Sequence, residues 1–211
     1  ITLTPPWLTL DLGSEMQVLS WSINRPGFVQ SRRILWREVR NADLPPELDV
    51  DRWLKGELQQ IDSEDAVTFL TSRSITQHVI RNVVLEECNV TAVATVGLSN
   101  AEHVGRRKNA IGNGFGTINI AVTMAPGVMQ CALLEVLSIA SEARTTAVIE
   151  TGYKLPTGVA TGTGTDCIAI AAPAGDIRFA GKHTAIGEAV GRAVYDAVRS
   201  GAEAWVDETR Q

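Results

Sequence analysis

The hydrophobic residues of this chain follow two different periods, and the period separates predicted strands from predicted helices. Runs that alternate hydrophobic with polar residues, or that are rich in β-branched residues, predict strands. The sequence NRPG at 24–27 ends the first of these runs, because Pro and Gly interrupt strands. The runs at 77–87 and 90–98 look like the two arms of a hairpin. The predicted strands are 16–23, 66–70, 77–87, 90–98, 119–123 and 168–172.

Three segments repeat their hydrophobic residues at helical spacing. At 49–61, Asp49 can cap a short helix whose apolar stripe includes Trp53 and Leu58. A longer helix is predicted at 130–150, with Gly152 as its stop. The last helix starts near Thr184 and has a face of small residues that another element can approach closely. That face can pack internally or across a homodimer, and we favour internal packing. Its members are Ala185, Gly187, Ala189, Gly191 and Ala193.

The order of these elements predicts the fold class. Residues 168–172 are apolar on both faces, which is typical of a central strand covered on both sides. Strands cluster in the first two thirds of the chain. We therefore expect an α/β (mixed α+β) fold, a layered single domain with a mixed sheet and about three main helices. The domain is expected to span residues 1–211, with 1–14 as an N-terminal extension.

Composition and charge narrow the class of protein. The chain has 211 residues, 45% of them hydrophobic, which suits one domain with a proper core. A net charge of −5 argues against nucleic-acid binding through a basic surface. We expect no membrane span and no signal peptide, and the initial Ile1 suggests that N-terminal residues are missing. The three cysteines are far apart in sequence and are expected to be reduced thiols in a cytoplasmic protein.

The sequence TGTGTD at 161–166 raises the question of function. A phosphate-binding loop needs a lysine after its last glycine and opens a helix, whereas here Thr165 and Asp166 follow Gly164 and a strand comes next. Glycines nevertheless allow close approach to a ligand, and an acid at the mouth of a buried strand is held rigidly. A tight turn with no chemistry is the alternative interpretation of the same residues.

A second polar cluster precedes the last helix. Lys182, His183 and Thr184 stand where a helix N-terminus favours anions and oxyanions. If this helix folds back along the strand that follows Asp166, then Asp166 and His183 can meet, and a carboxylate beside an imidazole is the general-base half of many hydrolases. A simple helix cap is again the alternative. The histidines and cysteines form no metal-binding motif, so no metal site is predicted.

Taken together, several stretches resemble one family, the adenosylcobinamide amidohydrolases of prokaryotic corrinoid salvage. The resemblance covers about residues 15–200, and its most specific pieces are TGTGTD and AGKHTAIGEA. It implies hydrolysis of the amide bond of adenosylcobinamide, which gives adenosylcobyric acid and the aminopropanol arm on the way to coenzyme B12. The other stretches are INRPGF, ILWREVRNADLPPEL, ATVGLSNAE, GTINIAV, LLEVLSIASEARTTAV and the part of the last helix at 192–198, RAVYDAV.

Amide hydrolysis assigns candidate roles to these residues. Water activated by Asp166 or His183 is the expected nucleophile, with Lys182 and the loop amides stabilising the oxyanion. A threonine nucleophile, Thr163 or Thr165, is the variant mechanism. Amide and charged side chains are expected to pair with the carboxamides on the rim of the corrin ring. The expected substrate-binding residues are Asn24, Arg25, Arg40, Asn41, Asn100, Glu102, Asn119, Thr161, Gly162, Thr163, Gly164 and Thr184.

The corrinoid is expected to be a substrate, and the sequence shows no required cofactor. The DxHxxG pattern of corrinoid carrier modules, whose histidine binds cobalt, does not occur. Two alternatives stay open. A non-catalytic corrinoid-binding or uptake protein would not need Asp166, Lys182 and His183 in one pocket, and an amidohydrolase for a smaller amide would have a small, closed pocket.

Overall fold

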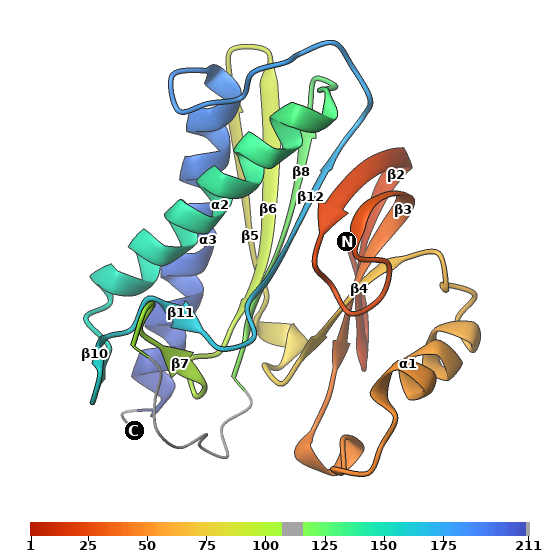
Figure 1. Ribbon diagram of the computed structural model, residues 1–211, viewed down its shortest axis with the longest axis vertical. Helices are drawn as coiled ribbons and strands as arrows, with labels where there is room; N and C mark the ends of the chain where they lie inside the picture. Colours follow the sequence, from red (N-terminus) through yellow and green to blue (C-terminus); the bar gives the residue numbers. More distant parts are fainter. Residues whose placement is uncertain (107–115, 210–211) are drawn as a thin grey trace.

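The computed structural model describes residues 1–106 and 116–209, and it confirms a mixed α/β domain (Figure 1). Its main sheet has the strand order β4-β3-β2-β12-β8-β6-β5, with β1 beside β2. The strands are β1 Thr2–Thr4, β2 Trp7–Ser20, β3 Gly27–Glu38, β4 Val67–Thr71, β5 Val79–Leu85, β6 Cys88–Val96, β8 Ile118–Ala125 and β12 Cys167–Ala172. The α-helices of the described residues are α1 Val50–Gln59, α2 Gln130–Glu150 and α3 Ala185–Thr209.

Shorter elements connect these. They are the 3-10 helices Asn41–Asp43 and Ile75–Gln77 and the two-residue strands β7 Ala101–Glu102, β9 Lys154–Leu155, β10 Gly158–Val159 and β11 Gly162–Thr163. β7 and β11 pair with each other outside the main sheet, and so do β9 and β10. The β7–β11 pair matters for function, because β11 begins the TGTGTD loop.

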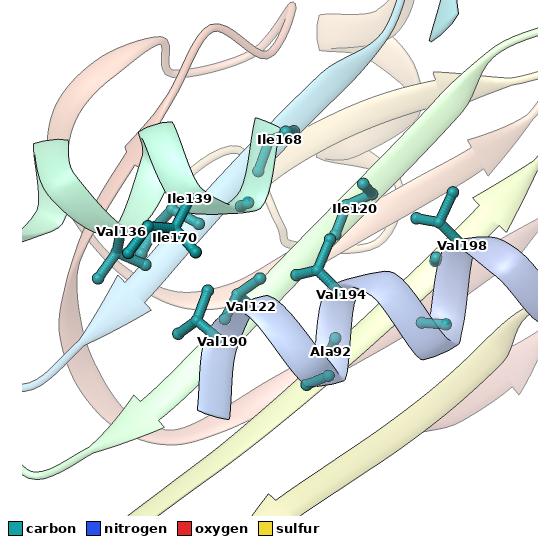
Figure 2. Close-up of a cluster of buried hydrophobic side chains, with 14 of the residues drawn as sticks. Ala92, Ile120, Val122, Val136, Ile139, Ile168, Ile170, Val190, Val194 and Val198 are labelled. Atoms are coloured by element: carbon teal, nitrogen blue, oxygen red, sulfur yellow. The ribbon is translucent and has the colours of Figure 1, made fainter. Parts of the chain in front are cut away.

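The central strands are buried on both faces, as the apolar run at 168–172 predicted. Ile168, Ile170 and Ala172 of β12 point toward α2 and α3, and Figure 2 shows this cluster between the helices and the sheet. The opposite face carries small residues, among them Ala169 and Ala171, and it packs against side chains from β2, β3 and β4. Small residues on this face let the second half of the sheet, strands β2, β3 and β4, lie close over β8 and β12.

Several predicted elements are confirmed almost to the residue. β5 and β6 form the antiparallel hairpin, and α2 covers Gln130–Glu150. Asp49 caps α1, since its carboxylate accepts a hydrogen bond from the backbone N–H of Arg52 at 3.0 Å. Thr184 caps α3 in the same way, accepting from the N–H of Gly187 at 3.0 Å. This capping accounts for Thr184 without any contact to a substrate.

The N-terminal third differs from the prediction in two places. Residues 1–14 are no extension, because β1 and most of β2 lie in the sheet and Leu8, Leu10 and Leu12 are buried. The strand β3 was not predicted at all. Its arginines hide the alternation of hydrophobic and polar residues. One of them, Arg37, is nevertheless half-buried, because it lies between the rings of Trp7 and Trp53 and pairs with a glutamate of α1.

The small-residue face of α3 packs inside the molecule. Ala189 and Ala193 are fully buried, and a Cβ at Gly191 would lie 3.6 Å from the side chain of Ile139 in α2. A Cβ at Gly187 would come within 2.2 Å of the Gly181 carbonyl oxygen, so only glycine fits there. The small-residue face therefore packs against the rest of the molecule, as favoured.

Two further observations concern the cysteines and the helices. All three cysteines are free thiols, with Cys88 and Cys167 buried and Cys131 exposed. Within residues 1–106 and 116–209, no helix combines the length and the apolar character needed to cross a membrane.

Candidate active site

A pocket of about 490 Å³ opens where the parallel strands β8 and β12 begin side by side. One wall comes from these two strand ends and from the TGTGTD loop. The facing wall comes from the second half of the sheet, at the ends of β2, β3 and β4. The lining residues are Trp21, Ile23, Val39, Leu44, Phe69, Leu70, Ser72, Thr117, Asn119, Gly164, Thr165, Asp166 and Cys167.

Asp166 is the anchor of the loop wall. Its side chain is only 7% exposed, and each of its two carboxylate oxygens accepts two hydrogen bonds. Oδ2 forms an ion pair with Nη1 of Arg144 and accepts from the N–H of Thr163 at 2.9 Å. Oδ1 accepts from the Thr163 hydroxyl at 2.5 Å and from the N–H of Ile118 at 3.2 Å. The carboxylate therefore joins the loop, β8 and α2 at one point.

Arg144 reaches this carboxylate from the middle of α2. Its side chain is 17% exposed, and burial lowers the pKa of its guanidinium. The ion pair with Asp166 compensates for the cost of placing that charge inside the protein. Gly162 makes room for the pair, since a Cβ there would lie 2.5 Å from Asp166 Oδ2 and 2.8 Å from Arg144 Nη1.

The backbone of the loop is held from three further directions. Trp21 donates its indole N–H to the carbonyl oxygen of Asp166 at 2.8 Å, and the Thr117 hydroxyl donates to the carbonyl oxygen of Thr165 at 2.8 Å. The N–H of Gly164 donates to the carbonyl oxygen of Asn100 at 3.1 Å. These contacts fix the loop before any ligand binds, which is what an active site needs in order to orient a reacting bond.

The two threonines considered as nucleophiles each lack one requirement. The Thr163 hydroxyl contacts a carboxylate, but Thr163 does not line the pocket. Thr165 lines the pocket, but among the described residues its hydroxyl contacts no carboxylate or imidazole. Cys167 also lines the pocket, and burial raises the pKa of its thiol to about 12, so it stays protonated and is a poor nucleophile.

Lys182 and His183 do not join Asp166, which corrects the expectation that these residues meet. The connection after β12 does not fold back along the strand. It runs to the start of α2, where Val128 bridges to Ala174 and Ile177, so α3 begins at the opposite end of β12 from the loop (Figure 1). Lys182 forms an ion pair with Glu142 beside a separate pocket between α2 and α3, and His183 is exposed.

The predicted substrate-binding residues divide into those near the pocket and those away from it. Asn119 lines the pocket, is 1% exposed and donates its amide to the carbonyl oxygen of Leu70 at 2.7 Å. Asn100 contacts Gly164 at the pocket wall. Glu102 and Thr161 stand behind the loop: Glu102 pairs with Gly162 in the β7–β11 ladder, and its carbonyl oxygen accepts from the N–H of Thr161.

The other predicted residues serve the structure or lie elsewhere. Asn24 donates to the carbonyl oxygen of Ala66 at 2.7 Å and so ties the turn after β2 to β4. Arg25, at a φ of 59°, donates to the carbonyl oxygen of Gln30. Arg40 is exposed beside a separate hollow near the N-terminus. The side chain of Asn41 falls outside the described part of the chain.

Sequence reasoning missed two contributors to the site. Arg144 appears as a lone cation within a helix that faces the core, and that isolation was the available signal. Trp21 was assigned to the strand predicted at 16–23 and was not among the candidate site residues. Its position one residue beyond the strand end, beside a turn, is what places it at the pocket.

The layered fold and the pocket over the strand ends define a small α/β protein with a single carboxylate among the described pocket-lining residues. The family model of the adenosylcobinamide amidohydrolases matches residues 2–210, nearly the whole chain, and the protein belongs to this family of hydrolases. No curated protein gives a significant match. Among solved structures, the chain is similar to the PH0078 protein from Pyrococcus horikoshii OT3, with 10% sequence identity, 91% of this chain and 74% of that chain covered, and a TM-score of 0.44.

Proposed function

We propose that this chain hydrolyses adenosylcobinamide in the pocket beside the TGTGTD loop. The amide bond to the aminopropanol arm is cleaved, and the products are adenosylcobyric acid and free aminopropanol, in salvage toward coenzyme B12. The observation that carries this proposal is the loop itself. The most specific stretch of the family resemblance forms the polar wall of a pocket, and the carboxylate of its Asp166 is held by an ion pair with Arg144.

Asp166 is the proton acceptor in this proposal. It is the only carboxylate among the described residues that line the pocket, and no imidazole or amine joins it there. Water attacks the amide carbon while its proton passes to Asp166. The tetrahedral intermediate then expels the amine, which receives that proton as the carbon–nitrogen bond breaks. We assign the hydrogen bond to the oxyanion to the hydroxyl of Thr165, which lines the pocket.

The two oxygens of Asp166 suit different tasks. Oδ2 is held by the guanidinium of Arg144 and by a backbone N–H. Oδ1 carries the two contacts that give way more easily, a 3.2 Å bond from the N–H of Ile118 and a bond from the hydroxyl of Thr163, which can rotate. We therefore assign the proton transfer to Oδ1 and the positioning of the group to Oδ2.

The separation of Lys182 and His183 from Asp166 favours the alternative of a corrinoid-binding protein without catalysis. Turnover decides between the two. The protein is incubated with adenosylcobinamide, before and after dialysis against a chelator, and adenosylcobyric acid and aminopropanol are quantified. We expect both products in equal amounts and no loss after chelation. Corrinoid binding without either product, with and without added metal, would contradict hydrolysis.

A pair of matched variants tests which pocket is used. Thr165→Phe places a ring in the pocket beside the loop, whereas Thr146→Phe places one in the pocket between α2 and α3 that Lys182 lines. Both threonines are exposed, so neither change forces a large group into the core. We expect the first variant to lose turnover and the second to keep it. The reverse result would move the site to the helices.

The setting of the reaction follows from the same proposal. The corrinoid is bound as a substrate that leaves after cleavage, and the protein holds no corrinoid as a cofactor. Three free cysteines, two of them buried, suit a reducing compartment, so we place the enzyme in the cytoplasm.

A further inference from the structure

The pocket is small for the whole substrate of the proposed function. At about 490 Å³ it matches the size of pockets that enclose a drug-sized ligand, which are roughly 300–1,000 Å³. A corrinoid with its macrocycle, its carboxamide arms and an adenosyl group is far larger than such a ligand. Only a part of adenosylcobinamide can therefore enter, and that part must include the scissile amide and the arm beyond it.

Two large hydrophobic side chains stand exposed at this same pocket. Trp21 is 47% exposed and Ile23 is 39% exposed, and both line the pocket. Other lining residues, such as Phe69 and Cys167, are buried. Exposed apolar side chains that adjoin a pocket mark a candidate ligand-binding surface.

Hydrogen bonds hold the Trp21 ring and the backbone on both sides of Ile23 in place before a ligand arrives. The indole N–H of Trp21 is bound to the carbonyl oxygen of Asp166 at 2.8 Å, which sets the edge of the ring and leaves much of its surface open. The hydroxyl of Ser22 donates to the carbonyl oxygen of Asn24 at 2.8 Å, and the amide of Asn24 anchors the turn on β4. A rigid aromatic surface loses little entropy when a flat ligand stacks on it.

We infer that the pocket takes only the aminopropanol arm with its amide, and that the corrin ring lies outside it on the surface formed by Trp21 and Ile23. This inference rests on the proposed function and adds how the substrate is divided. Trp21 is then a specificity-determining residue. It contacts the ring and, through its N–H, also holds the backbone of Asp166, so substrate recognition and the catalytic loop share one side chain.

Two probes separate the parts of the substrate. Adenosylcobyric acid carries the ring without the arm, and the N-acetyl derivative of aminopropanol carries the arm without the ring. Their dissociation constants are measured by calorimetry on five proteins: wild type, Trp21→Ala, Trp21→Phe, Thr165→Phe and Phe179→Ala. The last is the matched control, because it removes another exposed aromatic ring that does not line this pocket.

The inference predicts a crossed pattern. Trp21→Ala weakens adenosylcobyric acid about tenfold, the size of one lost stacking contact, and leaves the arm probe unchanged. Trp21→Phe keeps an aromatic side chain, so its dissociation constant for adenosylcobyric acid stays within about threefold of the wild-type value. Thr165→Phe abolishes binding of the arm probe and spares adenosylcobyric acid. Phe179→Ala changes neither.

Three results would overturn it. Trp21→Ala could leave the affinity for adenosylcobyric acid unchanged. Trp21→Ala could weaken the binding of both probes equally, which would mean that the loop has collapsed. Trp21→Phe could lose as much affinity as Trp21→Ala, which would assign the effect to the lost N–H bond. If the variants show the crossed pattern but the wild type releases no aminopropanol from adenosylcobinamide, the proposed hydrolysis is contradicted and this division of the ligand still stands.

Discussion

Replacing Arg144 with methionine removes one partner of a buried ion pair and keeps most of the side-chain volume. The Asp166 carboxylate is then left 7% exposed, with hydrogen bonds from Thr163 and Ile118 but no opposite charge. Breaking a buried pair on one side costs about 3–5 kcal/mol. Because three hydrogen bonds to the carboxylate remain, we expect the lower end, about 3 kcal/mol.

Chemical denaturation with urea measures this loss directly. A fall of about 3 kcal/mol corresponds to a melting temperature lower by about 6–12 °C in a protein of this size. Asp166→Asn in the Arg144→Met background should restore part of the stability, since the buried charge is then gone. Arg192→Met is the control. Its ion pair with Asp196 is long, at 4.0 Å, and its side chain is 69% exposed, so we expect less than about 1 kcal/mol there.

Two results would contradict a stabilising Arg144–Asp166 ion pair: Arg144→Met as stable as Arg192→Met, or effects of Arg144→Met and Asp166→Asn that simply add. Either result would mean that the two side chains are not coupled. The loop would then owe its position to its backbone hydrogen bonds alone.

Three further predictions follow from the site. Gly162→Ala should lower both stability and turnover, because its Cβ would displace the ion pair between Arg144 and Asp166. Gly181→Ala, with open space around its Cβ, should change neither. Equal effects of the two variants in melting and turnover assays would contradict this. Lys182→Met and His183→Ala should keep kcat within about threefold of wild type, since neither residue lines the pocket, and a loss beyond about a hundredfold would return them to the chemistry. Unfolding lets the Cys167 thiol ionise near its ordinary pKa of 9.0, whereas the folded state holds that pKa at about 12. The free energy of unfolding should therefore fall as pH rises between these values, and Cys167→Ala should remove that part of the slope while keeping activity.

Local signals predicted much of the fold. The hairpin β5–β6, the helix α2 and the doubly buried strand β12 each carry their pattern within a single segment. β3 was missed because its pattern depends on a partner far away in sequence. Arg37 reads as solvent-exposed until Trp7, Trp53 and a glutamate of α1 are known to surround it.

The site was predictable only in part, for a related reason. The sequence TGTGTD stands out by its composition, and Asp166 is one of the residues that line the pocket. Its partner Arg144 comes from a helix 22 residues earlier in the chain, and Trp21 comes from the other half of the sheet. Lys182 and His183 sit just before a helix, which is where functional groups often gather, but the direction of the connection after β12 takes them away. The spacing of hydrophobic residues does not specify the direction of that connection.

The measurement that tests the account most directly compares wild type with Asp166→Asn. Turnover of adenosylcobinamide and the dissociation constant of adenosylcobyric acid are measured on both, below the melting temperature of the variant. Loss of a general base lowers kcat by about 10²–10⁴-fold. We predict a loss of that size with corrinoid affinity kept within a few-fold. A variant that releases aminopropanol within about tenfold of the wild-type rate would contradict the role of Asp166 as the proton acceptor.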